Sequence, residues 1–119
     1  MRLDIQLFGL DQWIYNNKGD EVYLRKANQI HGFFLDNGYD DEKQGHQRVK
    51  KEVILELIST IKEVLAQHEL APELLPTCSG FFFGSYDYDD WYFEQLEDAL
   101  PKIEQLIKPG AQYFYSVWW

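Results

Sequence analysis

Three polar residues spaced three apart, Arg25, Asn28 and His31, form the first group that could do chemistry. On a helix, residues at this spacing lie side by side, so these side chains could converge on an anionic or hydrogen-bonding ligand. His31 could also act as a general base if a carboxylate lay nearby. Alternatively, Asn28 and His31 are polar residues that bond to the backbone at the core boundary. The sequence leaves both interpretations open.

A second group surrounds the stretch 80–84, in which two glycines bracket three consecutive Phe residues. The Phe run predicts a buried strand, and the small residues at its ends leave room for a ligand beside the main chain. Aromatic residues after the strand could stack on a base or an aromatic partner. The candidate ligand-binding residues of this group are Thr77, Ser79, Ser85, Tyr86, Asp87, Asp89 and Trp91.

The acidic run Asp87, Asp89 and Asp90 invites a metal-binding interpretation, because hard cations take clustered carboxylates. The spacing lacks the rest of a calcium loop, however, and carboxylates are favoured at helix starts by capping and by the helix dipole. We therefore expect no metal and no cofactor. The sequence has no Gly-x-Ser-x-Gly elbow, phosphate loop or paired cysteines, and Cys78 has no base defined by the sequence. This pattern favours a non-enzymatic protein.

Periodicity predicts the elements that would position these residues. Strands are expected near 2–8, 80–85 and 112–118, with 80–85 in the centre. Helices are expected over 20–36, 48–67 and from about 87 or 89 to 108. Asp20 would cap the first helix, and Pro101 should kink or divide the third. Residues 11–20 suit either a short strand and turn or an ordered loop, 37–47 a loop, and 69–75 a helical turn.

The predicted fold is a single α+β domain over residues 1–119, in which a small sheet is covered mainly on one face by three helices. If the strands 80–85 and 112–118 are neighbours, the helix between them makes a right-handed parallel crossover. The Phe run would then fill the core, and the polar ends of the strand 80–85 would remain for a ligand.

Charge is distributed unevenly over the chain, which has a net charge of −9. Residues 1–68 hold 11 acidic and 9 basic side chains, whereas residues 69–119 hold 9 acidic and 2 basic ones. Direct binding to a nucleic-acid backbone is not expected, because it depends on clustered Lys and Arg. The acidic surface could approach a basic groove on a nucleic-acid enzyme, or could simply maintain solubility. No segment has the apolar length of a membrane span, which favours a cytoplasmic protein.

Three motifs resemble those of a family of small phage and prophage proteins. Residues 23–34 carry Arg-Lys-Ala-Asn-x-Ile-His, residues 75–85 carry Leu-Pro-Thr-x-Ser-Gly-Phe-Phe-Phe-Gly-Ser, and residues 88–92 carry Tyr-Asp-Asp-Trp-Tyr. The chain departs from the family pattern at Arg2, where Gly is usual, at Asp90, where Glu is usual, and in its ending Val117-Trp118-Trp119, where Ser-Trp is usual. The resemblance singles out Arg25, Asn28 and His31 and implies a phage-type origin without implying a mechanism.

The leading hypothesis is a phage- or prophage-type accessory protein that binds a host factor or small ligand. The binding cleft would join the polar rim of the first predicted helix to residues 80–91. One alternative is a small hydrolase or transferase in which His31 acts with Asp87 or Asp89. Another is an acidic nucleic-acid mimic that inhibits a host defence nuclease. The expected location is the cytoplasm of a bacterial host, and the aromatic end 114–119 could form a homodimer edge.

Overall fold

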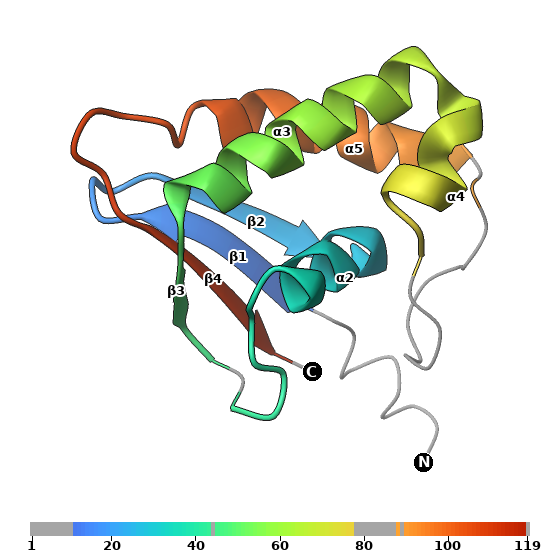
Figure 1. Cartoon of the computed structure of the whole chain (residues 1–119). Helices are drawn as coiled ribbons and strands as arrows, with labels where there is room; N and C mark the ends of the chain where they lie inside the picture. The colour runs from blue at the N-terminus through green and yellow to red at the C-terminus, as the bar shows by residue number, and fades with distance from the viewer. Residues whose placement is uncertain (1–10, 44, 78–87, 89, 119) are drawn as a thin grey trace.

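The computed structural model describes residues 11–43, 45–77, 88 and 90–118. A four-stranded antiparallel sheet with the strand order β2-β1-β4-β3 organises the described residues (Figure 1). The strands are β1 (Asp11–Asn16), β2 (Glu21–Arg25), β3 (Gln47–Val49) and β4 (Tyr113–Trp118). The structure confirms the predicted α+β fold and the predicted last strand.

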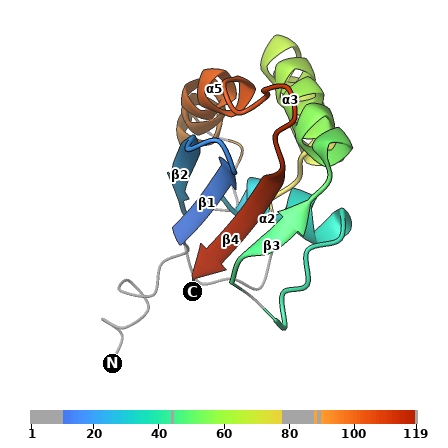
Figure 2. The same ribbon diagram turned by 90° about the vertical axis from the view of Figure 1, so that its left-hand side faces the viewer.

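The helices lie on one side of this sheet. In Figure 2 the strands stand side by side, α3 and α5 lie above them, and α2 lies behind β4 and β3. The helices are α2 (Asn28–Asp36), α3 (Lys51–Ala66), α4 (Ala71–Leu74) and α5 (Asp90–Glu104), with a 3-10 turn over His68–Leu70. The sheet therefore has an inner face under the helices and an outer face without a helix from the described residues.

Alternation along the strands and periodicity along the helices build one core between the two layers. The two long helices turn stripes of aliphatic side chains toward the sheet, and α5 adds the buried ring of Tyr92. Along each strand, the residues that alternate with the buried positions face outward. The fully buried large side chains of the core include Ile14, Ile30, Phe34, Ile54, Leu57, Ile61, Tyr92, Leu96, Tyr113 and Tyr115.

Residues 11–25 form a β-hairpin, which corrects the predicted helix over 20–36. Residues 21–25 alternate exposed and buried side chains, the period of a strand, and Ile14 pairs with Val22 in the register. Asp20 does not cap a helix. It ends the hairpin turn, where the Asn16 side chain donates to its carboxylate over 3.0 Å and Gly19 adopts φ +96°. The helix begins only at Asn28, after Lys26 in the left-handed region (φ 58°).

The other predicted helices are present with different ends. The predicted start at residue 48 is wrong, because residues 47–49 pair with β4 as β3 before α3 begins at Lys51. The third helix runs unbroken through Pro101 to Glu104, so the predicted division is wrong and the predicted end at 108 is four residues too late. The predicted helical turn over 69–75 is present as the 3-10 turn and α4.

Two predicted strands, 2–8 and 80–85, lie outside the described residues, and so does the parallel crossover that depends on the second. The predicted homodimer stays a prediction. Its expected basis, an open edge at the last strand, does not hold over residues 113–115, because these pair with both β1 and β3.

Candidate functional site

The three residues of the predicted polar rim do not share one helix face. Arg25 is the last residue of β2, and its side chain is 55% exposed with Nε 4.0 Å from an Asp11 carboxylate oxygen. Asn28 and His31 lie in α2 and are buried, with 2% and 0% of their surface exposed. The chain separates them because it changes from strand to helix at residues 26 and 27.

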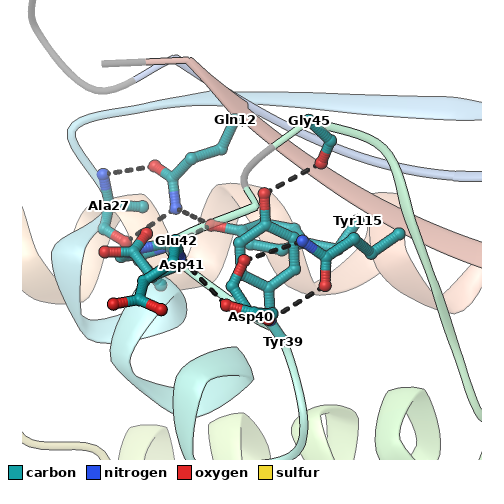
Figure 3. A network of polar contacts seen from close by, with 10 residues as sticks. Gln12, Ala27, Tyr39, Asp40, Asp41, Glu42, Gly45 and Tyr115 are labelled. Atoms are coloured by element: carbon teal, nitrogen blue, oxygen red, sulfur yellow. Dashed lines mark hydrogen bonds and ion pairs between the residues drawn. The ribbon is translucent and has the colours of Figure 1, made fainter.

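A buried polar network joins three elements, and Figure 3 shows its members Gln12, Ala27 and Tyr115. His31 belongs to it through the Tyr115 hydroxyl. The Gln12 side chain of β1 accepts a hydrogen bond from the Ala27 amide over 2.8 Å and donates to the Ala27 carbonyl over 2.9 Å. Gln12 Nε2 also lies 3.0 Å from the Tyr115 hydroxyl, which lies 2.9 Å from His31 Nδ1. The network thus ties β1 and β4 to the start of α2.

The direction of these hydrogen bonds follows from the groups involved. The Gln12 amide can only donate at Nε2, so the Tyr115 hydroxyl accepts there and donates to His31 Nδ1. A neutral imidazole then carries its proton on Nε2, which lies 3.2 Å from an Asp41 carboxylate oxygen. Burial lowers the pKa of His31, and the nearby Asp41 carboxylate opposes that shift without reversing it. Neutral His31 therefore satisfies both neighbours.

A loop closes over this network. The Tyr39 hydroxyl donates to the Gly45 carbonyl over 2.8 Å, and the Gln47 side chain makes two 2.8 Å hydrogen bonds to the Asp40 backbone (Figure 3). The Tyr115 ring stacks on the Phe34 ring, with the ring centres 4.1 Å apart, and packs edge-on against the Tyr39 ring, with the ring centres 4.9 Å apart. A general base must reach its substrate, whereas both His31 nitrogens are engaged inside the core. The arrangement is typical of a structural network.

The second predicted group is only partly described. Ser79, Ser85, Tyr86, Asp87 and Asp89 lie outside the described residues. The Thr77 amide donates to the Tyr88 hydroxyl over 3.1 Å, and Trp91 is 44% exposed in the first turn of α5.

The first turns of α5 do approach the junction between β2 and α2. Gln95 donates to the Arg25 carbonyl over 3.0 Å and lies 3.1 Å from the Gln29 amide. Residues four apart share a helix face, so Trp91 lies on the same side of α5 as Gln95. Gln95 therefore joins the start of α5 to the junction between β2 and α2, through glutamines that the sequence did not single out. Most of the segment 80–91, to which the predicted cleft would join, lies outside the described residues.

The outer face of the sheet carries a group of residues that the sequence analysis missed. We call it the aromatic face. Its members come from β1, β2 and β4, and two pairs of rings are in contact: the ring centres of Trp13 and Tyr23 are 5.5 Å apart, and those of Tyr15 and Phe114 are 5.1 Å apart. Tyr23 is 50% exposed and Trp118 is 55% exposed. The aromatic face consists of Trp13, Tyr15, Tyr23, Phe114 and Trp118.

A hollow of about 310 Å³, the face pocket, opens on the aromatic face. His46 closes one side, where its Nδ1 lies 2.7 Å from the Tyr15 hydroxyl. Between Phe114 and Trp118 the outward row of β4 carries the small residue Ser116, whose side chain is fully buried. The face pocket is lined by Trp13, Tyr15, Glu21, His46 and Trp118.

The two carboxylates of the outer face have different surroundings. Asp11 accepts a 2.6 Å hydrogen bond from the Tyr23 hydroxyl and lies 4.0 Å from Arg25. Glu21 makes no side-chain hydrogen bond or ion pair within the described part of the chain, and it pairs across the hairpin with Tyr15. Glu21 and Tyr15 line the same pocket, and the pKa of Tyr15 is raised by burial and by the Glu21 charge. The face pocket therefore holds an unneutralised negative charge among aromatic rings.

Two further features bear on the binding of a ligand or metal ion. Within residues 11–43, 45–77, 88 and 90–118, no group of three or more His, Cys, Asp and Glu could hold a metal ion. A hollow of about 530 Å³ at the start of α3 is lined by three cations, Arg48, Lys50 and Lys51, together with Glu52. No described helix is long and apolar enough to cross a membrane.

Comparisons of this chain with known proteins found no relative. No protein-family model, no curated protein and no solved structure matches this chain.

Proposed function

We propose that this chain is a non-enzymatic accessory protein of phage or prophage type that binds a host protein through its aromatic face. The observation that carries the proposal is a set of five aromatic side chains on the sheet face that no described helix covers. Exposed apolar patches rimmed by polar groups mark interaction surfaces on soluble proteins. The protein would act in the cytoplasm of a bacterial host.

The composition of the aromatic face supports a protein partner. Trp and Tyr dominate the residues that contribute most binding energy at protein interfaces, because each buries a large rigid surface with little loss of side-chain entropy. Trp118 and Tyr23 are about half exposed, so a partner could remove much of their remaining surface from water. Arg25 at the end of β2 would lie at the rim of the same interface.

This surface replaces the cleft expected from the sequence. That cleft needed His31 and Asn28 at the surface, and both are buried in the core. Arg25 is retained from the original set, while Trp91 lies on the opposite layer, in α5. Among the described residues, the exposed tryptophans are Trp91 and Trp118, which represent two competing surfaces and provide a matched pair of variants.

The test is an affinity capture from bacterial lysate with the tagged full chain, followed by measurement of Kd with the purified captured protein. We expect Trp118→Ala to weaken binding by about 30-fold or more, the size expected of an interface hot spot, and Trp91→Ala to leave it unchanged. A partner that is lost with Trp91→Ala but retained with Trp118→Ala would reject the aromatic face as the binding surface.

A further inference from the structure

We infer that the face pocket receives a basic side chain, an arginine or lysine, from the partner protein. This inference rests on the proposed function and names the chemistry of the partner residue that enters the face pocket. It starts from the residues that line the face pocket, which combine two tryptophans and a tyrosine with one carboxylate, Glu21.

The aromatic walls suit a cation. The face of an aromatic ring carries partial negative charge and attracts an ammonium or guanidinium group within about 6 Å of the ring centre. Tryptophan provides the strongest such attraction, and two of the five lining residues are Trp13 and Trp118. A hollow of about 310 Å³ is large enough for a guanidinium group and its methylene stem.

Glu21 supplies the charge that a cation requires. The carboxylate has no hydrogen bond or ion pair within the described part of the chain, in contrast to Asp11, which Tyr23 and Arg25 engage. An incoming arginine could therefore meet an unoccupied carboxylate without displacing another partner. Two outer-face cations lie on the described strands. Arg25 is four residues from Glu21 along β2 and lies beside Asp11, and Arg48 belongs to β3, three strands away.

The charge of the whole chain favours the same occupant. A net charge of −9 attracts basic partners and repels acidic ones and nucleic acids. A neutral aromatic occupant would leave Glu21 unneutralised and partly desolvated, which is unfavourable. A basic side chain fits both the local and the long-range charge.

The test is an NMR titration of the full chain with a capped Gly-Ser-Arg-Ser-Gly peptide, followed through the tryptophan indole N–H resonances. A second peptide replaces the arginine with citrulline, which keeps the shape and removes the charge. We expect saturable shifts of the Trp13 and Trp118 indole signals with the arginine peptide by roughly 10 mM, an upper range for a single weak contact, and no shift of Trp91. Higher salt should weaken the interaction.

Variants identify the carboxylate. Glu21→Gln should weaken binding of the arginine peptide by about threefold to tenfold, whereas Glu69→Gln, which removes an exposed carboxylate on another element, should not change it. Equal binding of the citrulline peptide, no effect of Glu21→Gln, or no shift at Trp13 and Trp118 would each overturn the inference. No shift at Trp13 and Trp118 is also the result expected if another part of the chain already fills the face pocket, and the inference is wrong in that case too.

Failure of the inference and failure of the proposed function are distinguishable. If the captured partner depends on Trp118 but the arginine peptide does not bind, the aromatic face is the interface and the cation is not its ligand. If the captured partner does not depend on Trp118, the proposed function itself fails.

Discussion

The two faces of the sheet use polar and aromatic side chains in opposite ways. On the inner face, Gln12, Tyr115 and His31 are buried and satisfy one another's hydrogen bonds. On the outer face, aromatic rings remain exposed and the Glu21 carboxylate has no hydrogen-bond or ion-pair partner among the described residues. A satisfied buried network stabilises and specifies a fold, whereas exposed aromatic rings beside an unpaired charge are suited to binding. Variants of the two faces should therefore affect different properties.

The largest expected effect is on the inner face. His31→Ala should lower the free energy of unfolding by about 3 kcal/mol, because it opens a cavity and leaves the Tyr115 hydroxyl and Asp41 without their shared partner. Chemical denaturation followed by circular dichroism measures the change. His46→Ala, at an exposed position, is the control and should cost less than about 1 kcal/mol. A similar loss from both variants would mean that the network has no special role in stability.

Removing the hydroxyl oxygen of Tyr115 should have a smaller effect on the free energy of unfolding. Tyr115→Phe keeps the ring against Phe34 but removes the hydroxyl between Gln12 and His31, so we expect a loss of about 1 to 2 kcal/mol in unfolding free energy. The same denaturation experiment measures it. No loss would indicate that His31 and Gln12 are satisfied without Tyr115.

The pH dependence of stability should report on His31. Its pKa is lowered in the folded chain, so the unfolded chain takes up a proton that the folded chain does not as the pH falls below the ordinary histidine value of 6.5. Stability should therefore decline from about pH 6.5 downward and be independent of His31 above it. Asp41, which faces the ring, moderates the decline because it favours the protonated form. His31→Gln should show a shallower decline between roughly pH 6.5 and 5. An unchanged slope would contradict the assignment.

The smallest effect concerns Ser116, which provides the opposite case to Tyr115. Its hydroxyl is buried and has no hydrogen-bond partner among the described residues. Ser116→Ala removes that group and should raise the unfolding free energy by about 0.5 to 1 kcal/mol. Thermal unfolding should show the increase. A clear loss of stability would indicate that the hydroxyl has a partner in the folded protein.

The sequence predicted the elements whose period is unambiguous. The aliphatic repeat in α3 and the aromatic, β-branched run in β4 each allow one structure. Residues 20–36 were ambiguous because Tyr23, Ala27, Ile30 and Phe34 fall at helical spacing although Val22 and Leu24 also alternate as in a strand. Pairing with β1 decided in favour of the strand over residues 21–25, and a pairing partner is not visible in local periodicity.

The candidate site was harder to predict for the same reason. His31 meets Tyr115, 84 residues away, and Gln12 meets the same hydroxyl from 103 residues away. The aromatic face is assembled from β1, β2 and β4, so it exists only after the strands are ordered. One local signal was present: Trp13 and Tyr15 alternate with Gln12, Ile14 and Asn16, which indicates a strand with one aromatic side.

The most direct test of the division between the two faces is the affinity of the arginine peptide for Tyr115→Phe and Trp118→Ala, measured by NMR at a temperature where both variants are folded. Binding by Tyr115→Phe should equal that of the unsubstituted chain, and Trp118→Ala should bind about tenfold more weakly, since it loses one wall of the face pocket. Weakened binding by Tyr115→Phe together with unchanged binding by Trp118→Ala would contradict the division of roles between the two faces of the sheet.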